Sequence, residues 1–125
     1  MPSPSDCTFS ESHEWFRVDG DMVTIGITQF AANELTDITY VEMQPAGTTV
    51  APGESVGEVE SVKTTSDVNT SFGGEIVEVN AAAASDPSLL NSDPFGSGWL
   101  VKMRFVGDSS SELMDQATYD GRYGT

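Results

Sequence analysis

Hydrophobic and polar residues alternate in short runs along most of the chain, and this period of two predicts strands rather than helices. The runs at 15–18 and 22–27 are joined by Asp19-Gly20-Asp21, a pattern that favours a β-hairpin. Further strands are predicted at 36–43, 54–62, 75–80 and 99–105. In the run at 36–43, Ile38 and Tyr40 alternate with Thr39 and Val41.

Helical signals are shorter and lie between or after the strands. Thr28 is a candidate N-cap for a helix at 28–34, with Phe30, Ala31 and Leu35 on one face. Asp86-Pro87 opens a short helical turn at 86–90, after a small-residue link at 81–85. The pattern S-x-x-E at 109–112 fits a capping box, which predicts a C-terminal helix at 110–116.

These elements predict a mostly β fold in which antiparallel sheets flatten into a sandwich or barrel with short peripheral helices. Nothing divides the chain, so residues 1–125 are expected to form a single domain. Residues 1–8 are Pro- and Ser-rich and are expected to form a loose leader. The Gly-containing segment 120–125 is expected to be a frayed tail.

The charge balance narrows the possible partners. The sequence has twenty acidic and five basic residues, which gives a formal net charge of -15. Such a surface repels nucleic acid and anionic membranes, whereas it suits solubility or steering towards basic proteins. The sequence has no apolar run of about 18 residues and no Arg-rich start, so we expect a cytoplasmic protein, or a mitochondrial matrix protein if a presequence has been removed.

The chemistry of an enzyme active site is poorly represented. The chain has one histidine, His13, one cysteine, Cys7, and no glycine-rich phosphate loop. One histidine without a nearby second ligand does not make a zinc site. We therefore expect no catalytic residue, no metal and no enzymatic activity. A lone cysteine also excludes an intrachain disulfide.

Lysine usage carries more information, because the chain has only Lys63 and Lys102. Lys63 follows the strand at 54–62 and precedes the polar connection 63–71, so it stands at the mouth of a hairpin whose second arm is predicted at 75–80. A modified carrier lysine needs exposure, a rigid mount and few competing amines, and this position offers all three. The alternative is a surface lysine that closes an acidic strand and pairs weakly with Glu60.

Several separated motifs occur in the order found in one family. They are SHEWFRVDGDMVTIGITQFA at 12–31, VESVKTTSD at 59–67, GEIVEVN at 74–80, P-x-L-x-N at 87–91 and GSGWLVKM at 96–103. With these segments the chain resembles the glycine cleavage system H protein from 12 to 119. It departs from the family pattern at Thr36, where Gly is usual, and at 69–73.

The resemblance implies a lipoyl/biotinyl-carrier fold of the hybrid-motif type and lipoate joined by an amide bond to Lys63. It implies a shuttle that carries an aminomethyl group from a pyridoxal-phosphate glycine decarboxylase to an aminomethyltransferase. Reducing equivalents would then pass to dihydrolipoyl dehydrogenase. A lipoate-protein ligase, or an octanoyl or lipoyl transferase, would modify the lysine.

Four further residues receive expected roles. Ser12, Glu14 and Asp67 are expected to line a cleft that shelters the cationic aminomethyl adduct, because acceptors for an amine are required there. Turn capping and solvation are equally consistent with these residues. Glu60, three residues before the lysine, is a candidate for recognition by the lipoylating enzyme, although an exposed strand Glu needs no such role.

Other interpretations remain open at this stage. Biotin carriers usually have Met beside the acceptor lysine, whereas Val62 and Thr64 flank it here. Lipoyl modules of 2-oxoacid dehydrogenases typically lack the Trp99 segment and a C-terminal helix. An H-like protein that relays lipoate to other enzymes has the same fold. An unmodified β-rich interaction domain is the alternative from a different class.

Overall fold

The computed structural model describes residues 6–10, 12–106 and 113–123. Its strands are Thr8–Phe9 (β1), Glu14–Asp19 (β2), Met22–Ile27 (β3), Ile38–Met43 (β4), Thr49–Val50 (β5), Ser55–Ser61 (β6), Thr65–Asn69 (β7), Gly73–Val79 (β8) and Val101–Val106 (β9). Its helices are Gln29–Leu35 (α1), Ala81–Ser85 (α2), Leu89–Ser92 (α3) and Gln116–Tyr123 (α4). The mostly β prediction is confirmed.

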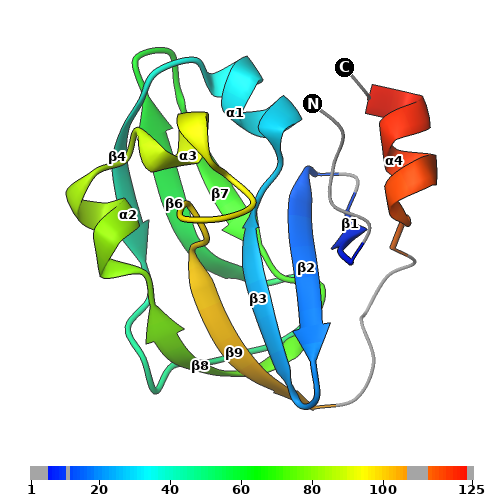
Figure 1. The fold of residues 1–125 in the computed structure, drawn as a ribbon. Helices are drawn as coiled ribbons and strands as arrows, with labels where there is room; N and C mark the ends of the chain where they lie inside the picture. The colour runs from blue at the N-terminus through cyan, green and yellow to red at the C-terminus, as the bar shows by residue number, and fades with distance from the viewer. Residues whose placement is uncertain (1–5, 11, 107–112, 124–125) are drawn as a thin grey trace.

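Two antiparallel sheets pack against each other (Figure 1). The larger has the strand order β1-β2-β3-β9-β8-β5, and the smaller has the order β4-β6-β7. Their facing side chains include Val56, Val59 and Val68 from the small sheet and Ile76 and Val101 from the large one, all fully buried. This apolar contact fixes the sheets relative to each other, since burial of branched side chains drives such packing.

The first hairpin forms where the alternation predicted it. Asp19 pairs with Met22, so Gly20 and Asp21 alone make the turn between β2 and β3. Gly20 has a φ of 66°. Glycine adopts this left-handed conformation without steric cost.

Among the described residues, no helix combines the length and the apolar composition that a bilayer crossing requires.

Strand β4 forms as predicted, but its alternation is interrupted. Ile38 and Val41 are both buried, although a regular strand would place them on opposite faces. The pairing with β6 shifts between Ile38 and Tyr40, and such a bulge changes which side chains face the core. The predicted face that joined Ile38 with Tyr40 is therefore wrong, and Tyr40 is 45% exposed.

The hairpin that follows differs from the prediction. β6 pairs with β7, which lies inside the segment 63–71 that was predicted to be a polar connection. The predicted second arm at 75–80 is β8, which belongs to the other sheet. Only Val68 of β7 is fully buried, so this strand has too few apolar positions to show the usual alternation.

Helix α1 begins at the predicted N-cap. The Thr28 side chain accepts a hydrogen bond from the Ala31 amide at 3.2 Å. Such a bond satisfies one of the free amides at a helix start. The buried positions of the helix are Ala32 and Leu35, whereas Phe30 and Ala31 are half-buried, so the predicted apolar face is only partly correct.

The remaining helices are displaced from their predicted positions. The small-residue link at 81–85 is helix α2, capped by the Asn80 side chain on the Ala82 amide at 3.1 Å. The turn predicted at 86–90 gives way to α3 at Leu89–Ser92. Alanine-rich segments favour helix, which explains why α2 forms once a cap is present.

The C-terminal helix also lies later than predicted. The capping box at 109–112 is outside the described residues. Met114 cannot belong to a helix, because its N–H and C=O pair with Phe9 at 2.8 Å each. Asp115 caps α4 instead by accepting from the Thr118 amide at 2.8 Å, and this bond lowers the pKa of Asp115. Residues 120–123, predicted to fray, are helical.

The predicted loose leader is wrong for its described part. Cys7 is 3% exposed and Phe9 is fully buried, because β1 pairs with β2 and with Met114. Burial raises the pKa of the Cys7 thiol to about 12. Strand β1 and helix α4 therefore lie together at one side of the large sheet (Figure 1).

Candidate functional site

Lys63 lies in the three-residue turn between β6 and β7, and its side chain is exposed. The Ser61 amide donates to the Thr64 carbonyl at 2.8 Å and closes the turn. The Ser61 hydroxyl accepts from the amides of Lys63 at 3.1 Å and Thr64 at 3.2 Å. One serine therefore satisfies the backbone of the turn that presents the lysine.

The turn also rests on the end of helix α1. The Val62 amide donates to the Asp37 carbonyl at 3.1 Å, and the Lys63 ammonium donates to the Glu34 carbonyl at 3.1 Å. A helix C-terminus carries partial negative charge, which favours a cation there. The Val62 bond holds the backbone of the turn, whereas the Lys63 bond positions only the side chain, and Val62 itself stays 67% exposed.

The second lysine has a different environment. Lys102 in β9 is half-buried, and its ammonium lies 4.9 Å from the centre of the Trp99 ring. A cation over an indole face is attracted by the ring electrons. Lys63 is therefore the lysine at a turn, whereas Lys102 lies along a strand against an aromatic ring.

Glu60 is exposed on β6, three residues before Lys63. It pairs with Tyr40 of β4 on one side and with Thr65 of β7 on the other. It therefore belongs to the outward-facing surface of the hairpin that carries the lysine.

Glu14 is a buried carboxyl group, only 2% exposed, at the start of β2. Its Oε1 accepts from the hydroxyls of Ser10 and, at 2.6 Å, Ser12. Its Oε2 accepts from the Asn69 amide at the end of β7 at 3.1 Å. Burial raises the pKa of Glu14, and these three donors oppose the rise.

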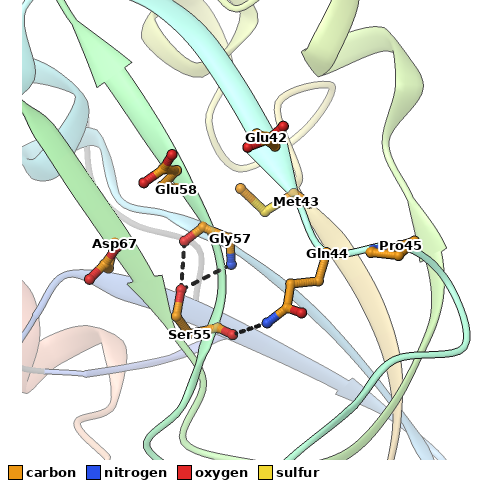
Figure 2. Close-up of a pocket in the computed structure, with 8 residues that line it drawn as sticks. All are labelled: Glu42, Met43, Gln44, Pro45, Ser55, Gly57, Glu58 and Asp67. Atoms are coloured by element: carbon orange, nitrogen blue, oxygen red, sulfur yellow. Dashed lines mark hydrogen bonds between the residues drawn. The ribbon is translucent and has the colours of Figure 1, made fainter.

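Asp67 lies on β7, two residues before Asn69. Its side chain lines an open hollow of about 350 Å³ together with Glu42 and Glu58 (Figure 2). Neither Ser12 nor Glu14 lines this hollow. The structure thus brings Ser12 and Glu14 into direct contact but does not bring Asp67 to them: Asp67 lines the hollow, two residues before the Asn69 that contacts Glu14.

Hydrogen bonds join several of the residues that line the hollow. The Gln44 side chain donates to the Ser55 carbonyl at 2.8 Å, and the Ser55 hydroxyl donates to the Gly57 carbonyl at 2.8 Å (Figure 2). A Cβ on Gly57 would approach the Glu42 carbonyl to 2.5 Å. Only glycine therefore permits this close passage of β4 and β6.

Three residues that support the site were missed in the sequence. Ser10 and Asn69 contact Glu14, and Ser61 shapes the lysine turn. No periodicity marks either residue: Ser10 lies only four residues before Glu14 in the chain, whereas Asn69 is brought to Glu14 by the packing of a distant segment. Ser61 could have been found, since a serine two residues before a turn residue often accepts a hydrogen bond from the amide of that residue.

Within the described residues, no group of three or more His, Cys, Asp or Glu is placed to hold a metal ion.

Comparison with known proteins gives a consistent result. The family model of the glycine cleavage H-protein matches residues 7–123. A glycine cleavage system H protein of Thermus thermophilus is 46% identical over 121 residues, covering 95% of this chain and 94% of that protein. The counterpart from Bacteroides thetaiotaomicron is 42% identical over 120 residues, with 95% of each chain covered.

A solved structure agrees in three dimensions as well. The crystal structure of a glycine cleavage system H protein from Mycobacterium marinum superposes with a TM-score of 0.90 at 40% identity. The match covers 98% of this chain and 100% of that one. The chain therefore belongs to the glycine cleavage system H protein family, the lipoyl carrier proteins of that system.

Proposed function

We propose that this protein carries lipoate in amide linkage on Lys63 and is not itself an enzyme. The observation that supports this proposal is the exposed Lys63 side chain on a turn fixed by the Ser61 hydroxyl and by the Val62 amide, which donates to the Asp37 carbonyl. Acylation requires an amine that an enzyme can reach, and a carrier requires a mount that does not move with it. The residues present fit both needs.

The chemistry of the shuttle comes from the cofactor: lipoate supplies a disulfide that accepts an aminomethyl group and can be reduced and reoxidised. The protein supplies presentation. The turn presents the exposed Lys63 side chain, whose ammonium donates to the Glu34 carbonyl in the unmodified protein, and after acylation tethering raises the local concentration of the arm at each docked enzyme. The proposed partners are glycine decarboxylase, aminomethyltransferase, dihydrolipoyl dehydrogenase and a lipoate-protein ligase or octanoyl or lipoyl transferase.

We further propose that Glu14 and Ser12 receive the cationic amine of the adduct between visits. A buried carboxylate is a strong acceptor for an ammonium group, and Ser12 is the exposed member of its three donors. Rotation of the Ser12 hydroxyl would free one lone pair of Oε1 for the incoming amine. Asp67 on β7, whose side chain lines the separate hollow of Figure 2, is the candidate for a second acceptor. Glu60 is the candidate for recognition by the lipoylating enzyme.

The attachment site is tested with a matched pair of variants, Lys63→Arg and Lys102→Arg. Each protein is incubated with lipoate, ATP and a lipoate-protein ligase, and intact mass and tryptic peptides are measured. We expect a lipoyl increment in the wild type and in Lys102→Arg, on the peptide that contains residue 63, and none in Lys63→Arg. An increment that persists in Lys63→Arg would contradict the assignment.

Glycine–bicarbonate exchange with purified glycine decarboxylase then separates glycine cleavage from lipoate relay. We expect the lipoylated wild type to support exchange and the lipoylated Lys102→Arg variant to match it. A lipoylated protein that supports no exchange would indicate relay, and a chain that is never lipoylated would indicate an unmodified interaction domain.

A further inference from the structure

The C-terminal helix packs against the segment that leads to Glu14. Tyr119 of α4 is 2% exposed, and its ring stacks on Phe9 of β1 at a centroid distance of 4.8 Å. Met114, just before α4, pairs with Phe9 through two backbone hydrogen bonds of 2.8 Å. The helix is therefore anchored to the large sheet next to the residues that precede β2.

The Tyr119 hydroxyl joins two features of the site. It lies 2.9 Å from Nδ1 of His13 and 2.7 Å from Oγ1 of Thr28. Thr28 is the N-cap of α1, and its amide donates to the His13 carbonyl at 3.0 Å. One phenol therefore meets both the turn before β2 and the start of α1.

One proton arrangement satisfies every group in this contact. Thr28 Oγ1 already accepts from the Ala31 amide, so its own O–H can donate to the Tyr119 oxygen. The Tyr119 O–H can then donate to an unprotonated Nδ1 of His13. Burial lowers the pKa of His13, which favours the neutral ring, and burial raises the pKa of Tyr119 to about 12, which keeps its proton in place.

His13 adopts a conformation that needs support. Its φ is 70°. Such a value is uncommon for a residue with a side chain and persists where the surroundings hold it. The His13 ring contacts Phe30 at 4.5 Å and Tyr123 at 4.7 Å between ring centres. Because His13 stands between Ser12 and Glu14, a change in its backbone would move both.

We propose that Tyr119 is a positioning residue that, through His13 and Thr28, holds Ser12 and Glu14 in place to retain the aminomethyl adduct. The inference rests on the proposed function of Lys63, Ser12 and Glu14. It assigns to α4 a part in the working site, although α4 lies more than fifty residues after the lysine in the chain. A helix that only covered the sheet would allow the Tyr119 hydroxyl to face solvent, whereas here it contacts His13 and Thr28.

The test compares Tyr119→Phe with Tyr123→Phe, which removes a hydroxyl from the same helix while keeping a ring against His13. We expect the lipoylated, aminomethyl-loaded Tyr119→Phe protein to release formaldehyde and ammonia about three to ten times faster than the wild type, the range that one hydrogen bond supports. We expect Tyr123→Phe to match the wild type. Lipoylation of Lys63 should be the same in all three.

A second readout uses the unloaded protein and does not depend on the shuttle. NMR titration of the His13 ring nitrogens and of the Glu14 carboxyl should show a changed His13 tautomer and a shifted Glu14 pKa in Tyr119→Phe only. Wild-type titrations together with a wild-type release rate in Tyr119→Phe would overturn the inference. Should that variant not fold, Thr28→Ser, which keeps the hydroxyl and the cap, is compared with Thr28→Ala, and equal release rates would overturn it.

The outcomes separate the two proposals. If the wild type takes up no lipoyl group, the proposed function fails and the retention role fails with it, while the titrations still decide whether Tyr119 positions Glu14. If the wild type is loaded but Tyr119→Phe behaves like Tyr123→Phe in both readouts, only the inference fails.

Discussion

Glu14 is a structural link between the two sheets, and it is also a buried carboxyl group whose charged form is disfavoured by desolvation. Its carboxylate links the start of β2 to the end of β7 through the Asn69 amide, so it ties the large sheet to the lysine hairpin. The same group is buried, and burial disfavours its charged form. A carboxylate kept at such a position in spite of desolvation is a marker of a functional site.

This desolvation predicts the pH dependence of a Glu14→Gln variant. Gln can point Oε1 at the Asn69 amide and its NH₂ at the two serine hydroxyls, so the contacts survive without the charge. The raised pKa means that wild-type stability falls as pH rises above the ordinary value of 4.5. We therefore expect the free energy of unfolding of the variant, relative to the wild type, to increase from about pH 4.5 towards neutrality.

Urea unfolding at several pH values measures this difference, and a difference that is constant or falls with pH would contradict it.

In the aminomethyl-loaded protein, the loss of the Glu14 charge is expected to weaken retention of the adduct. Release of formaldehyde and ammonia should be faster in Glu14→Gln, because the amine loses its counter-charge. An unchanged release rate would remove Glu14 from the cleft while leaving its structural role.

At the residue scale, the sequence predicted that Lys63 is exposed near a bend after a strand, while its role and those of Ser12, Glu14 and Asp67 stay predictions. The exposure of Lys63 could be predicted because turn-forming residues surround it. The contact of Ser12 with Glu14 is local and could be anticipated. The contribution of Asn69 and Tyr119 could not, because it depends on segments far from Glu14 in the chain being brought together by packing.

At the scale of elements, the hairpin β6–β7 explains how a polar segment can be a rigid mount. Its rigidity comes from its pairing and from the bond of the Val62 amide to the Asp37 carbonyl after α1, rather than from a buried strand. The Ser61 hydroxyl bonds the amides of both Lys63 and Thr64 at the tip. Its removal tests whether the geometry of the turn matters for modification.

We expect Ser61→Ala to speed hydrogen exchange at the amides of Lys63 and Thr64 and to lower kcat/KM for lipoylation about threefold to tenfold. Ser66→Ala is the matched control, because the Ser66 hydroxyl donates to the adjacent Asp67 carbonyl and not to the tip. Overall stability should change little, since the tip is exposed. Lipoylation at the wild-type rate in Ser61→Ala would show that the ligase itself shapes the turn.

The elements that the sequence placed wrongly have two causes. β7 is specified by its pairing with β6 rather than by its own pattern, whereas α2 and α4 have local caps, Asn80 and Asp115, that were overlooked. The hairpin β2–β3 and helix α1 were placed correctly because a two-residue turn and an N-cap are local signals. Tertiary contacts decide where local signals are weak.

At the scale of the whole molecule, the net charge of -15 is the dominant feature. Like charges on a small protein repel one another and oppose the compact state. The described residues include ion pairs of Arg17 with Asp6 and of Arg104 with Asp21. Five basic residues are too few to pair most of the twenty acidic ones, so stability should depend on ionic strength.

Raising NaCl from about 0.01 to about 0.15 M shortens the screening length from about 30 to about 8 Å. We expect Tm at neutral pH to rise by roughly 4 °C, which corresponds to about 1 kcal/mol. Thermal unfolding followed by circular dichroism measures it. The control is the same series near pH 4.1, the isoelectric point, where the salt effect should nearly vanish. A Tm that falls with salt at neutral pH would show that attractive pairs dominate.

The edge strands of the two sheets also affect how readily copies of the protein aggregate by strand pairing. β1 and β5 have only two residues each, and β4 is interrupted by a bulge. The outer side of β7 would be the longest template for cross-chain pairing, but its Asn69 amide is already taken by Glu14 and Asp67 places a charge beside it. The Glu14 carboxylate thereby occupies one backbone donor at the outer edge of the lysine-bearing hairpin, which makes strand pairing between two copies at this edge less favourable.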